Sequence, residues 1–306
     1  TDPSYAGQLV TLTYPHIGNY GVDDDWFEGG PGEPGDRSPI KPAGFIVREV
    51  YDGPLPAGRR SLGEFLAENS VPGICNVDTR KLTLHLRDAG AQNGMILGAN
   101  VDAGLPTDSE LKLALSVLDS FPPMEGRSLI GGVGATEIVT IPGDGPHVGL
   151  FDCGTKANIA RELSKRGARV SVFPSGTTAD EVIEAGVDGI LASNGPGDPA
   201  ELQVQVAQIR ALIDRMPVLG ICLGHQLVAE ALGGETFKMK FGHHGVNHPV
   251  RDATTDRVYV TSQNHGFAVS DETLPDGIDV WFKNANDGTV EGLIDRTRRF
   301  ATVQFH

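Results

Sequence analysis

The residues with the clearest chemical meaning lie around Cys222, in the stretch Gly-Ile-Cys-Leu-Gly at 220–224. An apolar run over 218–221 predicts a buried strand before the cysteine, and apolar positions at helical spacing over 227–232 predict a helix after it. Glycines around a cysteine at such a turn are typical of an elbow that presents a nucleophile. An isolated cysteine is more often a core residue, but this pattern favours the nucleophile. The start of the helix should favour its thiolate.

A cysteine nucleophile needs a base, and the nine histidines of the chain are the candidates. His225 follows Cys222 by three residues on the same expected helix, so we expect its side chain to point away from the thiol. His306 ends an expected strand, where a side chain can overhang the carboxyl edge of a sheet. Taken alone, each histidine is more often a surface or hydrogen-bonded structural residue.

Acyl transfer also needs donors for the developing oxyanion. The amide of Leu223, directly after the nucleophile, is one candidate. Gly195 is the second, because a residue without a side chain lets the backbone approach a reacting carbonyl. The alternative for its segment, 194–199, is a rigid turn without a chemical role. Neither a Gly-x-Gly-x-x-Gly pattern nor a Walker lysine occurs, so we predict no nucleotide site in this chain.

Three further histidines, His243, His244 and His248, raise the question of a metal site. No cysteine, aspartate or glutamate stands among them in the sequence, and we therefore predict no metal site there. The three cysteines, at 75, 153 and 222, are too few and too scattered for a disulfide framework or a zinc site.

Strands and helices alternate around the elbow, and these elements must position it. Expected strands over 147–153, 168–173, 189–193 and 218–221 are separated by expected helices over 156–166, 178–185 and 201–215. This order predicts an α/β fold, with a mainly parallel sheet flanked by helices on both faces. Ligands bind such sheets at the carboxyl ends of the strands, where Cys222 and the 194–199 segment both fall. After residue 235 we expect strands and turns, the last strand covering 300–305.

The first 140 residues predict a smaller, mixed α/β N-terminal domain. Strands are expected over 9–14 and 43–50, with an exposed loop over 21–42 between them. Helices are expected from Ser61, over 78–87 and over 111–118. A linker over 141–146, rich in glycine and proline, divides the chain into domains at 1–140 and 147–306.

The composition limits the kinds of partner and location that the chain can have. The 306 residues carry 40 acidic and 25 basic side chains, a net charge of −15, which disfavours nucleic acid as a partner. No apolar run reaches the roughly 18 residues that a membrane span needs, and no signal peptide opens the chain. We expect a cytoplasmic protein with two domains.

Several motifs together resemble one family. The Gly-Ile-Cys-Leu-Gly-His-Gln elbow, the Ser-Asn-Gly-Pro-Gly-Asp-Pro segment at 193–199 and the Gln-Phe-His at 304–306 resemble the class I, triad-type glutamine amidotransferases. Within that class, the chain is most similar to the small, glutamine-hydrolysing subunit of carbamoyl phosphate synthetase. This closer resemblance depends on four stretches outside the catalytic motifs, at 12–19, 78–83, 90–94 and 238–245.

The resemblance implies a site and a reaction. Cys222 corresponds to the nucleophile, His306 to its base, and the amides of Leu223 and Gly195 to the oxyanion donors. Contacts to L-glutamine are implied for Ser4, Gly195, Gly197, Leu223, Gln226, Gln263, Asn264, Gly266 and Phe267. The thiolate attacks the side-chain amide, ammonia leaves, and water hydrolyses the γ-glutamyl thioester to glutamate. The ammonia passes through a tunnel to a large subunit that makes carbamoyl phosphate.

The resemblance also assigns the other parts of the enzyme. The first domain, 1–140, is expected to dock to the large subunit. ATP, magnesium and bicarbonate belong to that subunit, and no cofactor is expected in this chain. The family's third triad member, a glutamate, is expected two residues after His306, and we interpret the sequence as part of a longer chain.

Two alternatives remain at this stage: an amidotransferase that serves another synthase, and a catalytically idle scaffold that only docks to a large partner. The non-catalytic motifs argue against the first, and Cys222 with His306 against the second. The sequence does not distinguish arginine from pyrimidine synthesis, and it gives neither the oligomeric order nor the feedback effectors.

Overall fold

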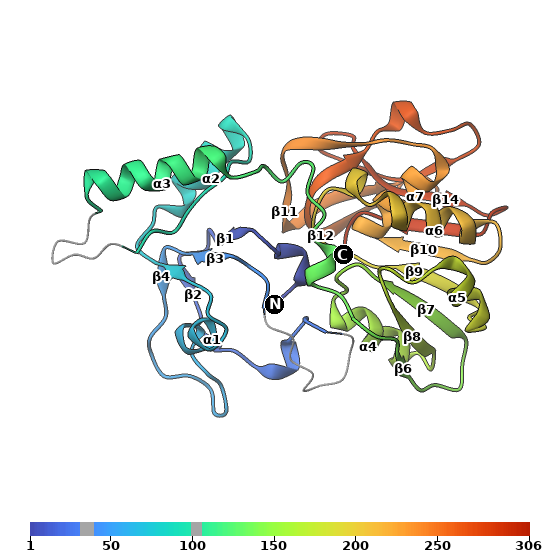
Figure 1. Ribbon diagram of the computed structural model, residues 1–306, viewed down its shortest axis with the longest axis horizontal. Helices are drawn as coiled ribbons and strands as arrows, with labels where there is room; N and C mark the ends of the chain where they lie inside the picture. Colours follow the sequence, from blue (N-terminus) through green and yellow to red (C-terminus); the bar gives the residue numbers. More distant parts are fainter. Residues whose placement is uncertain (31–39, 99–105) are drawn as a thin grey trace.

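A computed structural model describes residues 1–30, 40–98 and 106–306 (Figure 1). Its largest element is a ten-stranded sheet, with the order β12-β11-β13-β14-β15-β10-β9-β7-β8-β6. Five neighbouring strands in the middle of this order are parallel, namely β8 (Arg169–Pro174), β7 (His147–Asp152), β9 (Gly189–Ala192), β10 (Val218–Ile221) and β15 (Phe300–Val303). These strands carry the predicted catalytic motifs at their carboxyl ends.

The rest of the sheet is antiparallel, so the expectation of a mainly parallel sheet is wrong for the whole. Its antiparallel strands are β6 (Val139–Ile141), β11 (Thr236–Asp252), β12 (Val258–Val269), β13 (Asp279–Asn284) and β14 (Val290–Asp295). The physical reason is the connections: helices separate the parallel strands, whereas short turns join β11 to β12, β13 to β14 and β14 to β15, and a short turn can only reverse the chain. The sheet is therefore mixed.

Helices cover both faces of the parallel strands, as predicted. Successive strand residues alternate between two core clusters: Phe151 and Phe173 belong to one, and Leu150 and Val172 to the other. The first cluster packs against α5 (Ala179–Glu184), α6 (Gln203–Ile213) and α7 (Leu223–Leu232), and the second against α4 (Ala157–Lys165). The carboxyl edge of the strands is left free of helices for the site.

Among its described residues, the N-terminal half contains two small parallel sheets and three α-helices (Figure 1). One sheet joins β1 (Leu9–Thr11), β3 (Gly44–Ile46) and β5 (Gly73–Ile74), and the other joins β2 (His16–Ile17) to β4 (Glu49–Val50). The helices are α1 (Leu62–Glu68), α2 (Thr79–Ala89) and α3 (Asp108–Ser120). The strand expected over 43–50 is thus two strands in different sheets. Of the loop expected over 21–42, residues 31–39 lie outside the described residues.

Besides the covalent linker, non-covalent contacts join the segment before β6 to the catalytic half. The segment before β6 runs along the catalytic half: Gly126 donates its amide to Asp198, and Ser128 forms a bridge with Gly197. β6 itself, at the start of the predicted linker, is an edge strand paired with β8. The division at 140 and 147 stays a prediction. Within the described ranges, no helix combines the length and apolar character that crossing a bilayer requires.

Candidate active site

The turn between β10 and α7 has the geometry of a nucleophile elbow. Cys222 occupies the N-cap position of α7 with φ 55° and ψ −105°, a conformation that is strained for a residue with a side chain. Both glycines are required by packing. A Cβ at Gly224 would lie 2.0 Å from the carbonyl oxygen of Ala192, and one at Gly220 would lie 2.7 Å from that of Gly224. The strand, the sharp turn and the helix are confirmed at the positions that the motif predicts.

The loop that follows β9 lies against this elbow. The amide of Gly224 donates to the carbonyl of Ser193 at 3.0 Å. Gly195 lies so close that a Cβ there would meet the carbonyl oxygen of Cys153 at 2.1 Å and the Leu223 side chain at 2.8 Å. The two backbone segments proposed to bind an oxyanion are therefore adjacent, and only glycine fits at 195.

His306 reaches the same edge from the neighbouring strand. β15 pairs with β10 in parallel, with Val303 opposite Ile221, and the amide of Cys222 donates to the carbonyl of Val303 at 2.8 Å. His306 follows β15, and backbone hydrogen bonds to Ser262 fix its main chain. Its Nε2 atom is buried and has no hydrogen-bond partner among the described residues. A buried imidazole with an uncommitted nitrogen suits a proton acceptor.

The electrostatics of the thiol differ from the expectation. Burial raises the pKa of Cys222 to about 12, and the charge of Asp2 acts in the same direction. Lys156 and the amide of Leu223 lower the pKa, but by less. The amide at the start of the helix therefore acts in the expected direction, but desolvation outweighs it and the resting thiol keeps its proton. The thiol must lose its proton to a base during attack.

Burial also lowers the pKa of His306, to about 4, with Lys156 acting in the same direction and Asp2 against it. The imidazole is therefore neutral at neutral pH, which is the form that can accept a proton. Asp2 and Lys156 influence both Cys222 and His306, which agrees with the closeness that the strand pairing gives the two residues.

An ion pair between Asp2 and Lys156, at 3.1 Å, is the part of the site that sequence reasoning missed. It brings the N-terminal segment to the catalytic edge. Ser4 there accepts a hydrogen bond from the side chain of Asn194 at 2.9 Å, one residue before Gly195. More than 150 residues separate the paired charges in the chain, so no local pattern could have found them.

The other predicted substrate residues come from β12, from α7 and from the loop after β9. The carbonyl oxygen of Asn264 lies 3.8 Å from the Cys222 sulfur, so this strand lines the nucleophile directly. Gln226 lies deeper, donating to the carbonyl of Phe267 at 2.8 Å and to the side chain of Gln304 at 2.9 Å. Gly266 is half-buried beside them. Gly197 lies further along its loop, at φ 101°, against the 126–129 segment.

The side chain of Gln263 lies among histidines. Its Oε1 atom is 2.7 Å from Nε2 of His265 and 3.1 Å from Nδ1 of His243. The fold also brings Asp287 and Glu291 to His243, so the reason given against a metal site, that no carboxylate stands among the histidines, is wrong in space.

His243, His265 and Glu291 place one ligand atom each within 4.8 Å of one another. Both ring nitrogens of each histidine nevertheless have protein partners: His243 contacts Gln263 and Asp287, and His265 contacts Gln263 and the carbonyl of Phe267. Each ring nitrogen therefore already contacts a protein group, and the absence of a metal stays a prediction.

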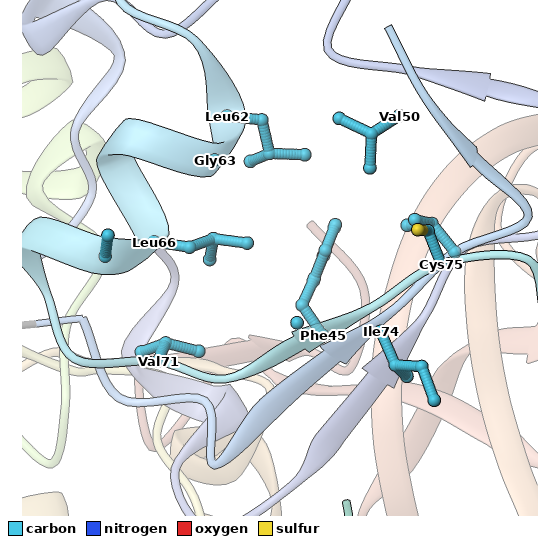
Figure 2. A pocket seen from close by; sticks show the side chains of 11 residues that line it. Phe45, Val50, Leu62, Gly63, Leu66, Val71, Ile74 and Cys75 are labelled. Carbon is cyan, nitrogen blue, oxygen red and sulfur yellow. The ribbon is translucent and has the colours of Figure 1, made fainter. Parts of the chain in front are cut away.

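The N-terminal half has a hollow of its own, of about 300 Å³. In Figure 2, Leu62 and Leu66 of α1 line one side, and Phe45 and Ile74 of the small sheet line the other. Its lining is apolar apart from the backbone and the thiol of the exposed Cys75. It offers no general base or anion-binding group for chemistry.

Comparison with known proteins agrees with this geometry. Residues 149–306 match the family model "Glutamine amidotransferase class-I", the class that the elbow, the adjoining loop and the histidine define. Residues 1–96 match the model "Carbamoyl-phosphate synthase small chain, CPSase domain". Over 53% of this chain, the crystal structure of a glutamine amidotransferase from Thermotoga maritima aligns at TM-score 0.42 and 16% identity, covering 76% of that structure, a likeness that adds no argument.

Two curated relatives cover the whole of this chain. The carbamoyl phosphate synthase small chain of Methanopyrus kandleri is 43% identical over 308 residues, and that of Methanocaldococcus jannaschii is 44% identical over 308 residues. This chain covers 82% of each relative. The chain therefore belongs to the carbamoyl phosphate synthase small-chain family, the glutamine-hydrolysing subunit of that enzyme. The predicted family, activity and enzyme class are confirmed.

Proposed function

We propose that Cys222 and His306 perform the hydrolysis, with backbone amides of Leu223 and Gly195 as the oxyanion donors. The thiol of Cys222 transfers its proton to the free Nε2 of His306 as sulfur bonds to the side-chain amide carbon of glutamine. The amide oxygen becomes an oxyanion held by the two N–H groups. His306 then gives its proton to the leaving nitrogen, and ammonia departs, leaving a γ-glutamyl thioester.

The second half of the reaction reverses these roles. Water attacks the thioester carbon and gives a proton to His306, the same amides hold the second oxyanion, and the C–S bond breaks. The proton returns to sulfur, so glutamate leaves and the thiol is regenerated. Every group in this cycle is a side chain, a backbone amide, substrate or water, which supports the proposal that this chain needs no cofactor.

The observation that carries the proposal is the parallel register of β10 and β15. It sets Cys222 and His306 at the ends of adjacent strands, and the unpartnered Nε2 of His306 is buried at the same edge. Ser4, Asn264, Gly266 and Phe267 lie around this edge and are proposed to hold glutamine, with Gln226 and Gly197 supporting them.

The fate of ammonia and the docking role of residues 1–140 are also proposals. The names of the relatives imply a large-chain partner, which would take ATP, magnesium and bicarbonate and receive the ammonia. Cytoplasmic location stays a prediction.

Hydroxylamine trapping tests the thioester. The chain, reconstituted with a carbamoyl phosphate synthase large chain, is incubated with glutamine and hydroxylamine, and γ-glutamyl hydroxamate is measured. The proposal predicts hydroxamate from the wild type and none from Cys222→Ala. Hydroxamate from both proteins would show that the acyl group is carried elsewhere.

A further inference from the structure

Glu291 is a buried carboxylate in the ten-stranded sheet. It lies on β14 with no exposed surface, its Oε1 accepts from Asn284 at 3.0 Å, and its Oε2 has no hydrogen-bond partner among the described residues. A buried carboxylate needs either a proton or a cation beside it. Within the described ranges, His243 is the residue that pairs with it, with Nδ1 at 3.3 Å from Oε1.

The surroundings of His243 favour its protonated, cationic form. Its second ring nitrogen lies 2.8 Å from a carboxylate oxygen of Asp287, so acidic groups flank both sides of the ring. Burial lowers the pKa of His243, but hydrogen bonds and charge from Glu291 and Asp287 outweigh burial, and the pKa is raised. The other titratable groups near the ring are His248 and His265, with ring centroids 5.0 Å and 4.9 Å away, and His244, whose pKa the charge of His243 helps to lower.

A continuous chain of side chains leads from this pair to the nucleophile. His243 contacts Gln263, Gln263 contacts His265, and His265 contacts the carbonyl of Phe267, at distances of 3.1, 2.7 and 2.8 Å. The same carbonyl accepts from Gln226 on α7, one turn after Cys222. The buried network therefore supports both β12, whose Asn264 lies against the Cys222 sulfur, and α7, which begins directly after Cys222.

The pairing of β11 with β12 is irregular around His243. β11 and β12 pair regularly at His243–Gly245, but the register shifts on both sides of that stretch. Gly242, at φ 75°, would place a Cβ only 2.3 Å from the carbonyl oxygen of His265. Where strand pairing is interrupted, side-chain contacts must fix the register.

We infer that Glu291 is a positioning residue for glutamine: it holds His243 as its buried counterion, and the pair fixes the segment Gln263–Phe267 beside Cys222. The inference rests on the proposed role of that segment in binding glutamine. Glu291 acts through His243 and Gln263 and does not itself touch substrate. Replacing Glu291 should therefore change KM rather than kcat, because this residue sets where glutamine lies and takes no part in proton transfer.

The dependence on pH follows from the raised pKa of His243. The imidazolium that pairs with Glu291 is present at pH values below that pKa and is lost as the pH rises through it. KM for glutamine should therefore increase toward high pH in the wild type. Removing the charge of Glu291 lowers the pKa of His243 and moves this increase to lower pH.

The test uses Glu291→Gln, which keeps the shape of the side chain and removes its charge, in the complex with the large chain. We expect KM for glutamine to rise about tenfold, with kcat within about twofold of wild type. Ammonia-dependent synthesis should not change. Titration of ¹³C-labelled histidine by NMR should show a lower pKa for His243, and Glu291→Asp, which keeps the charge, should restore part of the affinity.

Asp279→Asn is the matched control, because Asp279 is an exposed carboxylate on the neighbouring strand β13. It should leave KM and the titration of His243 unchanged. A Glu291→Gln protein that melts at a lower temperature but keeps the wild-type KM would overturn the inference, since Glu291 would then only stabilise the fold. A Glu291→Gln protein with a lower kcat and an unchanged KM for glutamine would also overturn the inference.

Two further results separate this inference from other accounts. One stoichiometric metal ion, retained after dialysis against EDTA and lost in Glu291→Gln, would overturn it and make the cluster a metal site. A wild type that hydrolyses no glutamine would refute the proposed function instead. In that case an unshifted pKa of His243 in Glu291→Gln would still overturn the ion pair.

Discussion

Helices α7 and α3 show two ways in which this chain builds a helix. Eight of the ten residues of α7 are buried, and none of the thirteen residues of α3 is. α3 begins with a complete capping box between Thr107 and Glu110, whereas Cys222 at the N-cap of α7 makes no side-chain cap. A helix with little tertiary support depends on its own caps.

This difference shows which part of the fold can accommodate a catalytic site. The packed core holds α7 in place, so its first amides need no side-chain cap: that of Gly224 donates to the carbonyl of Ser193, and that of Leu223 is left for the proposed oxyanion. α3 uses the same amides for its own stability, and it exposes Leu113 and Leu115 by 68% and 60%. The catalytic half therefore has a core that tolerates strain at Cys222, and α3 has no comparable support.

Replacing the proposed base, His306, should give a large effect at the α7 end. His306→Asn removes the proposed proton acceptor for a thiol whose pKa is raised to about 12. We expect kcat for glutamine hydrolysis to fall by about 10²–10⁴. His85→Asn, at an exposed histidine of α2, is the control for steady-state kinetics. Normal turnover by His306→Asn would remove this residue from the mechanism.

Displacing one oxyanion donor should have a somewhat smaller effect. A Cβ at Gly195 would meet the carbonyl oxygen of Cys153 at 2.1 Å, so Gly195→Ala must shift its amide. Loss of one such donor lowers kcat by about 10²–10³. Gly176→Ala is the matched control, because a Cβ there meets open space in the loop after β8. If Gly195→Ala melts like the wild type and turns over normally, the segment 194–199 is only a turn.

The smallest effect is expected on α3. Leu227, in the middle of α7, has no exposed surface, and Leu227→Ala should lower the free energy of unfolding by about 2–5 kcal/mol. Leu113→Ala on α3 should change it by less than about 0.5 kcal/mol. Urea denaturation of both variants measures the difference. Comparable losses would mean that α3 packs against the rest of the chain in solution.

Local signals explain what the sequence could predict. Ser61 and Asp78 cap α1 and α2 at the starts that the sequence predicts, because a cap depends on residues three apart. The elbow at Cys222 was predictable for the same reason. The antiparallel part of the sheet was not, because similar alternating patterns suit parallel and antiparallel strands.

Features built from distant residues escaped sequence reasoning. Asp2 of the N-terminal half forms an ion pair with Lys156 of the catalytic half, and Glu291 joins His243 across 47 intervening residues. The pKa of Cys222 depends on burial, which a motif does not report. The sequence predicted which groups react, and the state in which they rest depends on the fold.

The central claim is that Cys222 carries the acyl group from glutamine, and substitution by serine tests it most directly. The complex with the large chain is assayed for carbamoyl phosphate with glutamine and, separately, with ammonia. An alcohol is a far weaker nucleophile than a thiolate, so Cys222→Ser should abolish glutamine-dependent synthesis and leave ammonia-dependent synthesis intact. Synthesis from glutamine at the wild-type rate would contradict the account and make Cys222 a structural residue.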